Sequence, residues 1–310
     1  CGSDLRRWRE GPSSNAPATI PGHEIAGQIV QMGEQVRGYN TGDRIAVGPD
    51  VHCGQCFYCR HGRFHLCDHL ILYGITPGYH GGLSQKMVVP HELLSRGICH
   101  VIPEGLSDEA ASLAEPCSSV IACHQAAGTT LGEMVVIMGA GPIGCLHVAI
   151  AQSRGARVLV SEPNPVRRRM AEQFNPTAVI DPLQQDLKRE VHRLTHGLGA
   201  DRVICANPIA STHQQAVDIV RKGGEVVLFG GLPKAQPMTT MDANRIHYHE
   251  IRVVGSFSYH PTHHALALEL LAQGVIPAEK VISAVYPLDQ VQQAFEAAGA
   301  GSVLKIVIKP

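Results

Sequence analysis

The sequence predicts an α/β protein that contains a doubly wound parallel sheet of six strands and a second domain. The chain has 310 residues, about twice the size of a typical single domain. Short apolar runs alternate with helical patterns through its second half, which is typical of a parallel sheet covered by helices. A glycine-rich turn directly follows the first of these runs, as it does in sheets that bind nucleotides.

Six short segments with strand character follow one another between residues 134 and 254. They span residues 134–138, 157–160, 178–180, 202–205, 225–229 and 251–254. Helical patterns fill most of the gaps between them, and this alternation favours parallel strands joined by helical crossovers. A further helix over residues 261–274 and a terminal strand over residues 302–309 are expected after the sheet.

The composition excludes several classes of protein. Hydrophobic residues make up 44% and charged residues 17% of the chain, so a disordered chain is excluded. The formal net charge of -1 gives no general attraction to nucleic acid. Residues 134–153 form an uncharged run, but Pro142 and the glycines around it predict a strand, a turn and a buried helix instead of a membrane span. With no signal-peptide pattern, we expect a cytoplasmic protein that binds neither nucleic acid nor membrane.

The turn after the first strand predicts a dinucleotide-binding site of the Rossmann type. Gly139, Gly141 and Gly144 form a G-x-G-x-x-G pattern between a strand and a helix. The first glycine permits a tight turn, the second lets the backbone approach a pyrophosphate, and the third allows close packing of helix on strand. Pro142 and Ile143 open the helix, whose N-terminal N–H groups face the phosphates.

An acidic residue after the second strand favours NAD over NADP. Glu162 lies 18 positions after the last glycine of the turn, where a carboxylate accepts hydrogen bonds from the ribose and repels a 2′-phosphate. Arg167 and Arg168 follow it, and a basic residue in this region can instead accept a phosphate. Gly230 and Gly231 follow the fifth strand at its carboxyl end, where parallel sheets bind ligands.

Four cysteines with short spacings predict a structural zinc site. Cys53, Cys56, Cys59 and Cys67 form a C-x2-C-x2-C-x7-C pattern in a turn-rich segment. Four thiolates in one loop can surround zinc as a closed tetrahedron. An iron–sulfur cluster commonly has a proline after the last cysteine, whereas Asp68 stands there. Disulfides are the other alternative, but a secretory context is not indicated.

A third motif lies at the start of the chain. It comprises Cys1 to Asp4 and the stretch from Gly22 to Glu24, which continues through Gly27, Gly33 and Val36. With these residues the sequence resembles the zinc-containing medium-chain dehydrogenase/reductase family of the alcohol dehydrogenase type. The resemblance is closest to its sorbitol/polyol and L-threonine dehydrogenase branch. It covers essentially the whole chain, with three motifs in the same order.

The resemblance implies a GroES-like, mainly β catalytic domain that is interrupted by the nucleotide-binding domain. The catalytic domain is expected over residues 1–118, with the structural-zinc lobe at residues 48–70. The Rossmann domain is expected over residues 119–257, and residues 258–310 return to the catalytic domain. Family members carry further residues before the cysteine that is Cys1 here. We therefore expect either that this sequence is a fragment of a longer protein or that the catalytic domain is incomplete at its N-terminal side.

The resemblance also implies a second, catalytic zinc ion. Cys1 and His23 match two of its ligands. Glu115 or Glu24 would complete the set, as in the polyol branch, and Cys117 is the rival ligand. Such a Cys–His–carboxylate site keeps an open position for substrate.

Two neighbours of the expected zinc ligands have implied roles. Asp4 matches the family residue that orients the ligating His23, a role that carboxylates perform by fixing the histidine tautomer. Ser3 matches the hydroxyl that relays the substrate proton. The family commonly ends this relay with a histidine, and the chain has Arg6 there, which cannot release a proton near neutral pH.

The implied function is a zinc-dependent oxidoreductase that transfers a hydride between NAD and a secondary alcohol. A polyol, a sugar or an amino alcohol is the expected substrate, with two zinc ions per chain and NADP as the less favoured cofactor. The family is dimeric or tetrameric, so we expect a homodimer or homotetramer. Two alternatives remain: a noncatalytic dinucleotide-binding protein with one structural zinc, and a zinc-free reductase of quinones or enones.

Overall fold

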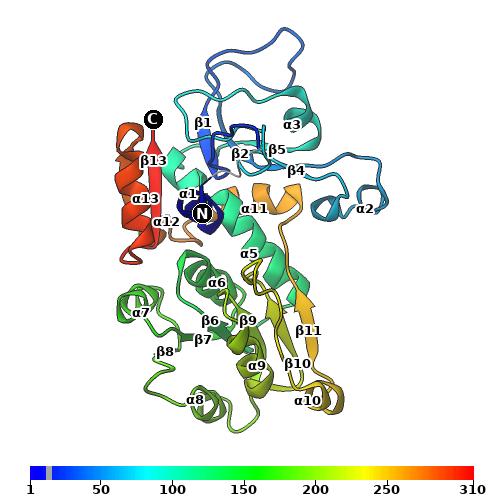
Figure 1. Ribbon diagram of the computed structural model, residues 1–310, viewed down its shortest axis with the longest axis vertical. Coiled ribbons are helices and arrows are strands. Elements are labelled where there is room, and N and C mark those ends of the chain that lie inside the picture. The colour runs from blue at the N-terminus through cyan, green and yellow to red at the C-terminus, as the bar shows by residue number, and fades with distance from the viewer. Residues whose placement is uncertain (12–15) are drawn as a thin grey trace. The chain divides into compact units, whose positions relative to one another are not determined.

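The computed structural model describes residues 1–11 and 16–310 and divides into two compact units (Figure 1). Unit 1 is formed by two segments of the chain, Cys1–Ser119 and Ser258–Pro310. Unit 2 is the continuous segment Val120–Phe257. The chain therefore leaves unit 1, builds unit 2 and returns to complete unit 1.

Unit 2 contains a parallel sheet of six strands in the order β11-β10-β9-β6-β7-β8. The strands are β6 (Met134–Met138), β7 (Arg157–Ser161), β8 (Ala178–Ile180), β9 (Ala200–Cys205), β10 (Val220–Leu228) and β11 (Arg252–Gly255). The first strand in sequence, β6, lies between β9 and β7, so the order reverses beside it. This confirms the predicted doubly wound sheet, in which ligands bind at the carboxyl ends beside the reversal.

Helices connect the strands of unit 2. They are α6 (Pro142–Ser153), α7 (Pro165–Glu172), α8 (Leu187–Leu194), α9 (Ala210–Ile219) and α10 (Ala243–Tyr248). Helix α6 packs on β6 and β7, and α9 packs on β9 and β10. All five residues of β6 are buried, as a central strand covered on both faces requires. Within the described residues, no helix is long and apolar enough to span a membrane.

Strand β10 begins earlier than the pattern predicts, at Val220 instead of residue 225. Val220 pairs with Ala200, and the register then shifts before Glu225 pairs with Arg202. Lys222, Gly223 and Gly224 lie in this irregular part, and their polarity and small size hide the strand in the sequence.

Unit 1 is built around small sheets. Strands β1 (Ile25–Gln28), β2 (Arg44–Gly48) and β5 (Ile98–Val101) form an antiparallel sheet with β2 in the centre. Strands β3 (Asp50–Val51) and β4 (Ile71–Leu72) form an antiparallel pair that encloses the cysteine-rich loop. Strands β12 (Ile282–Pro287) and β13 (Lys305–Lys309) pair in parallel.

The helices of unit 1 are short, apart from α5 and α11. They are α1 (Gly2–Glu10), α2 (Phe57–Arg60), η1 (Phe64–Leu66), α3 (His91–Arg96), α4 (Asp108–Ala111), α5 (Ala114–Ala127), α11 (Pro261–Ala272), α12 (Ala278–Val281), η2 (Leu288–Gln290) and α13 (Val291–Gly299). Helix α5 begins in unit 1 and continues into unit 2. Helix α1 packs on α13 from the returning segment, where Trp8 stacks on Phe295 with ring centroids 5.7 Å apart.

Candidate metal and cofactor sites

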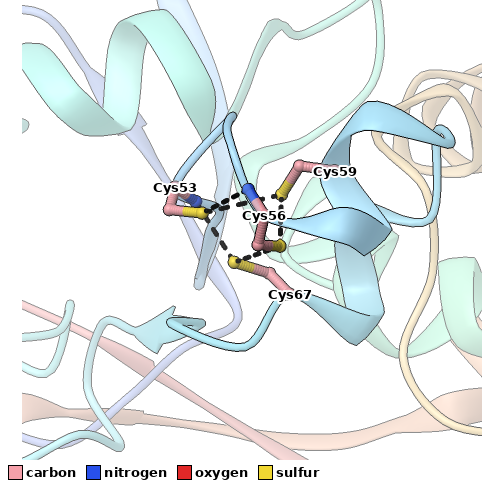
Figure 2. A group of neighbouring side chains, drawn as sticks. All are labelled: Cys53, Cys56, Cys59 and Cys67. Carbon is pink, nitrogen blue, oxygen red and sulfur yellow. Dashed lines mark hydrogen bonds between the residues drawn. The ribbon is translucent and has the colours of Figure 1, made fainter.

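The four cysteines of the predicted structural zinc site lie together in unit 1, with their sulfur atoms facing one another (Figure 2). All four sulfur atoms lie within 4.8 Å of each other. The separations are 4.0 Å from Cys53 to Cys59, 3.5 Å from Cys56 to Cys59 and 3.9 Å from Cys56 to Cys67. A tetrahedral zinc with Zn–S bonds of about 2.3 Å requires sulfur atoms roughly 3.8 Å apart. The cysteine cluster therefore fits zinc.

Backbone N–H groups also point at these sulfur atoms. The N–H of Cys53 and that of His69 donate to Cys67 Sγ at 3.2 and 3.3 Å, and the N–H of Cys56 donates to Cys53 Sγ at 3.4 Å. The backbone N–H of Cys59 lowers the pKa of the Cys56 thiol to about 6. Such donors stabilise the thiolate form, which is the form that binds metal.

A second group of metal-ligand atoms comprises Cys1, His23 and Glu24. One ligand atom of each lies within 4.8 Å of the other two. Cys1 precedes α1, while His23 and Glu24 follow Gly22 directly before β1. Gly22 has φ of 93°, and a Cβ atom there would lie 2.7 Å from Leu83 Cγ. Only glycine suits this tight turn, which directs the next two side chains to the group.

Asp4 contacts His23 at the ring nitrogen Nδ1. Asp4 Oδ2 lies 3.4 Å from His23 Nδ1, and both residues are buried. Burial alone would raise the pKa of Asp4, but the contact with His23 lowers it to about 2, so Asp4 is a carboxylate. A carboxylate beside Nδ1 leaves Nε2 as the metal-binding nitrogen. Ser3 Oγ donates to Cys1 Sγ at 3.3 Å, which places its hydroxyl next to the group.

Glu24 is paired with a cation from the returning segment. Its carboxylate forms an ion pair with Lys305, the first residue of β13. Burial would raise the pKa of Glu24, but the ammonium group of Lys305 outweighs burial and lowers it to about 2. Glu24 is therefore ionised, as a zinc ligand must be.

Glu115 lies beside the group and not in it. Within the described part of the chain, the group consists of Cys1, His23 and Glu24. Glu115 stands in the first turn of α5, where its Oε1 accepts a hydrogen bond of 3.2 Å from the Tyr259 hydroxyl. Burial, together with nearby carboxylates, raises the pKa of Glu115 to about 7.

Cys117, the rival ligand, is fully buried two residues after Glu115. Burial raises the pKa of its thiol well above the ordinary value, which opposes the thiolate form. Of the two carboxylates considered from the sequence, Glu24 lies in the group with Cys1 and His23, and Glu115 lies outside it.

The glycine turn of unit 2 has the shape that a dinucleotide requires. Gly139 has φ of 113°, and a Cβ atom on Gly144 would lie 2.0 Å from the Gly139 carbonyl oxygen. Gly141 caps α6, Pro142 follows at the first helical position, and no atom lies within 4 Å of the site of a Gly141 Cβ. The helix N-terminus beside Pro142 and Ile143 is therefore open to a phosphate.

Glu162 is fixed beside this turn at the end of β7. It is 4% exposed, and its two carboxylate oxygens accept hydrogen bonds from the N–H groups of Ala140 at 2.8 Å and Asn164 at 2.9 Å. Arg168 donates to the carbonyl oxygens of Glu162 and Pro163 and pairs with Asp181 at 3.0 Å. The guanidinium of Arg168 therefore already interacts with two carbonyl oxygens and one carboxylate.

The remaining predicted cofactor residues lie at helix and strand ends of unit 2. The Arg167 N–H donates to the Asn164 side chain that caps α7. Gly230 follows β10, and a Cβ atom there would lie 2.5 Å from the Asn207 carbonyl oxygen. Gly231 has open space around its Cβ position. Close approach between the loops after β9 and β10 therefore requires glycine at residue 230.

Sequence motifs did not indicate the partners that come from distant parts of the chain. Lys305 and Tyr259 belong to the returning segment, and the terminal strand expected around Lys305 gave no sign that this residue reaches the site. Asp50 is a further buried carboxyl of unit 1, and it lies three residues before the first zinc-lobe cysteine. A charged residue in an apolar strand was the only available signal for Asp50 and Lys305.

Comparisons with known proteins agree with this geometry. Residues 1–103 match the alcohol dehydrogenase GroES-like domain, and residues 142–273 match the zinc-binding dehydrogenase family. The chain is 32% identical over 317 residues to the sorbitol dehydrogenase of Halalkalibacterium halodurans, a match that covers 100% of this chain and 88% of the relative. It is 32% identical over 315 residues to the L-threonine 3-dehydrogenase of Pyrococcus horikoshii, covering 99% of this chain and 87% of the relative.

A solved structure shows the same fold over the whole chain. A protein from Sinorhizobium meliloti, described as a zinc-binding dehydrogenase and bound to NADP, aligns with a TM-score of 0.90 and 31% identity. The alignment covers 100% of this chain and 89% of that protein. The matches extend over both units, and the cysteine cluster fits the zinc that the family description names. The chain therefore belongs to the zinc-binding dehydrogenase family, with a GroES-like catalytic domain and a Rossmann nucleotide-binding domain.

Proposed function

We propose that this member of the family oxidises a secondary alcohol with NAD at a zinc ion held by Cys1, His23 and Glu24. The observation that carries the proposal is the convergence of these three ligand atoms within 4.8 Å. One thiolate, one imidazole and one carboxylate form a three-ligand set that leaves a fourth position for substrate. A polyol, a sugar or an amino alcohol is the proposed substrate, in keeping with the sorbitol and threonine dehydrogenases among the relatives.

The bound groups supply the chemistry that the side chains lack: zinc lowers the pKa of a coordinated hydroxyl, and NAD accepts a hydride. The protein orients the reactants and handles the proton. Asp4 fixes the ring of His23, since its carboxylate lies beside Nδ1. We assign the first step of proton transfer to Ser3 Oγ, which lies 3.3 Å from Cys1 Sγ. Glu115 stays beside the ligand group, held by the Tyr259 hydroxyl.

Two features of the structure, at Glu162 and at Arg168, support NAD as the preferred cofactor. Glu162 lies in the predicted position, and two N–H groups hold its carboxylate in place. An anion there repels a 2′-phosphate and accepts hydrogen bonds from ribose hydroxyls. Arg168 is engaged by two carbonyl oxygens and by Asp181, so it does not offer a phosphate an unoccupied guanidinium. Because the related Sinorhizobium meliloti structure is bound to NADP, the preference of this protein for NAD over NADP must be measured.

We propose a homodimer or homotetramer in the cytoplasm. Strand β11 is the last strand on one side of the six-stranded sheet, so one of its edges is available for pairing. Phe257, just after this strand, is 60% exposed, and Val254 in it is 37% exposed. All ten cysteines are free thiols, which suits a reducing compartment.

The test combines metal counting with turnover. We expect two zinc ions per chain, together with NAD reduction by a secondary alcohol or polyol that chelation abolishes. A His23→Ala variant should keep one zinc and lose turnover, while the zinc of the cysteine cluster remains. One zinc in the unmodified protein, with no turnover on any alcohol, would support the noncatalytic alternative. Reduction of quinones or enones without zinc would support the alternative of a zinc-free reductase.

A further inference from the structure

Asn207 is the second residue after β9, at the point where the order of the six-stranded sheet reverses. The neighbour of β9 on this side is β6, which leads directly into the glycine turn at Gly139. Doubly wound sheets bind dinucleotides at the carboxyl ends of the strands beside such a reversal. Asn207 therefore lies in the part of unit 2 where a dinucleotide is expected, although no sequence motif includes it.

The side-chain amide of Asn207 joins the end of β6 to the start of α9. Its Nδ2 donates to the carbonyl oxygen of Met138 at 2.9 Å, and its Oδ1 accepts from the Ile209 N–H and from Thr212 Oγ1, both at 3.0 Å. A carbonyl oxygen can only accept and a backbone N–H can only donate, so these partners allow one orientation of the amide. Asn207 therefore uses its donor towards the glycine turn and its acceptor towards the helix.

The backbone around Asn207 contacts two glycine turns. A Cβ atom on Gly139 would lie 3.1 Å from the Ala206 carbonyl oxygen and 3.4 Å from Asn207 Cβ. A Cβ atom on Gly230 would lie 2.5 Å from the Asn207 carbonyl oxygen, and the Gly230 N–H donates to the Cys205 carbonyl oxygen at 2.8 Å. Since β9 lies between β6 and β10, the loop after β9 is packed between the turns that follow these two strands.

The turn after β6 is also bonded to the strand on its other side. The Gly139 N–H donates to the Ser161 carbonyl oxygen at 2.8 Å, and the Ala140 N–H donates to Glu162 Oε2 at 2.8 Å. Both acceptors lie at the end of β7. Loss of the Asn207 amide should therefore leave the first turn and Glu162 together, and change their separation from the loop after β9.

We propose that Asn207 is a positioning residue for the dinucleotide, which sets the separation between the turn at Gly139 and the turn at Gly230. The inference rests on the cofactor binding that is part of the proposed function. NAD extends across the reversal of the sheet, so it needs both turns at the correct separation. AMP is only the adenosine half of NAD, and it needs the first turn and Glu162 alone.

The experiment compares the affinities of the full chain for NAD and for AMP by equilibrium dialysis. In Asn207→Ala, we expect the dissociation constant for NAD to rise about tenfold, because the two turns are no longer held in place before the cofactor binds. The dissociation constant for AMP should change less than about twofold. The ratio of the two constants therefore measures how well the turns are positioned.

Three further variants separate the two ends of the amide. Thr212→Val removes a donor to Oδ1 but leaves Nδ2 on Met138, so it should keep the wild-type ratio. Asn207→Asp keeps the acceptor and loses the donor, so it should change the ratio as Asn207→Ala does, and it serves if the alanine variant does not fold. Asn244→Ala, at an exposed position in α10, is the control for loss of an asparagine.

The melting temperature distinguishes positioning from a general loss of structure. Asn207→Ala and Thr212→Val should both lower it, since each removes a hydrogen bond at the start of α9, but only Asn207→Ala should change the ratio. An unchanged ratio in Asn207→Ala, or an equal change in Thr212→Val, would overturn the inference, as would a wild-type protein that does not bind NAD. If the wild-type protein binds NAD through Asn207 but oxidises no alcohol, the proposed oxidation fails and the positioning role stands.

Discussion

The ammonium group of Lys305 pairs with the carboxylate of Glu24, the same carboxylate that lies with Cys1 and His23. Both members of the pair are largely buried, with side-chain exposures of 10% and 11%. A buried carboxylate is costly without a positive partner. Lys305 therefore compensates the charge of Glu24, and a zinc ion at the proposed site would act on the same charge.

Replacing Lys305 should destabilise the protein most when zinc is absent. For Lys305→Met, we expect the free energy of unfolding in chelator to fall by about 3 kcal/mol, because a buried carboxylate is left unpaired. Added zinc should recover most of this loss. Urea unfolding with chelator and with zinc measures both effects.

Lys309→Met is the control for this experiment, because Lys309 is exposed and pairs with Glu109 at the surface. Its effect should stay below about 1 kcal/mol in both conditions. An equal loss for Lys305→Met with and without zinc would show that Glu24 does not serve the metal.

The cysteine cluster predicts a second change in metal content. Cys56→Ser should lower the zinc content by one ion per chain, because serine is a poor zinc ligand and three thiolates do not close the tetrahedron. Elemental analysis measures this directly. Cys99→Ser, in the half-buried β5 position outside the cluster, should retain all zinc. Loss of zinc from Cys99→Ser, or full zinc in Cys56→Ser, would contradict the ligand assignment.

Glu162 should control the choice between NAD and NADP. In Glu162→Gln, the ratio of kcat/KM for NAD to kcat/KM for NADP is expected to fall at least about tenfold, because the charge that repels the 2′-phosphate is gone. Steady-state kinetics with both cofactors gives the ratio. Glu172→Gln, at an exposed position at the end of α7, serves as the control. A wild-type enzyme that already prefers NADP would disprove the assignment to Glu162.

Two buried histidines in unit 2 predict a loss of stability in acid. Both ring nitrogens of His124 form hydrogen bonds. Nδ1 lies 2.9 Å from Thr129 Oγ1, and Nε2 lies 3.0 Å from His147 Nδ1. Burial lowers the pKa of His124 to about 3 and that of His147 well below its ordinary value. Unfolded histidines bind protons below about pH 6.5, and these folded ones do not. Stability is therefore complete above pH 6.5 and falls as the pH decreases towards 3.

The variant His147→Leu tests this pH dependence. One titrating group is removed, so the slope of unfolding free energy against pH between 6 and 5 should decrease by up to about 1.4 kcal/mol per pH unit. Urea unfolding at several pH values gives the slope. His196→Asn, exposed and in a backbone conformation that asparagine tolerates, should leave the slope unchanged. The same slope in His147→Leu and wild type would show that His147 titrates normally in the folded state.

The sequence predicts unit 2 well because its signals are local. Apolar runs and the glycines around Gly141 mark the strands and the turn, since parallel strands must be buried and the turn needs glycine. The prediction placed the start of β10 too late, because Gly223 and Gly224 interrupt its pattern. Its first residue is recognisable only from the pairing of Val220 with Ala200, which is a tertiary contact.

The candidate sites also contain some contacts that are local in the sequence and others that join distant segments. The cysteine cluster is local, and its spacing alone predicts that four thiolates meet. The contacts of Glu24 with Lys305 and of Glu115 with Tyr259 join residues that are far apart in the chain. No periodicity or spacing encodes such contacts, since they depend on how the returning segment packs. The choice between Glu24 and Glu115 as zinc ligand was therefore open from sequence alone.

The return of the chain to unit 1 imposes an order on its synthesis. A ribosome makes residues 1–119 before it makes unit 2, and Ser258, Tyr259 and Lys305 follow only after unit 2. Unit 2 is a continuous segment, so it can fold while the first part of unit 1 is still waiting for its partners. Until the returning segment is made, Glu24 lacks the ammonium group of Lys305, while the cysteine loop already has the β3–β4 pair at its base. The cysteine loop can therefore bind zinc before the returning segment packs, and that segment completes unit 1.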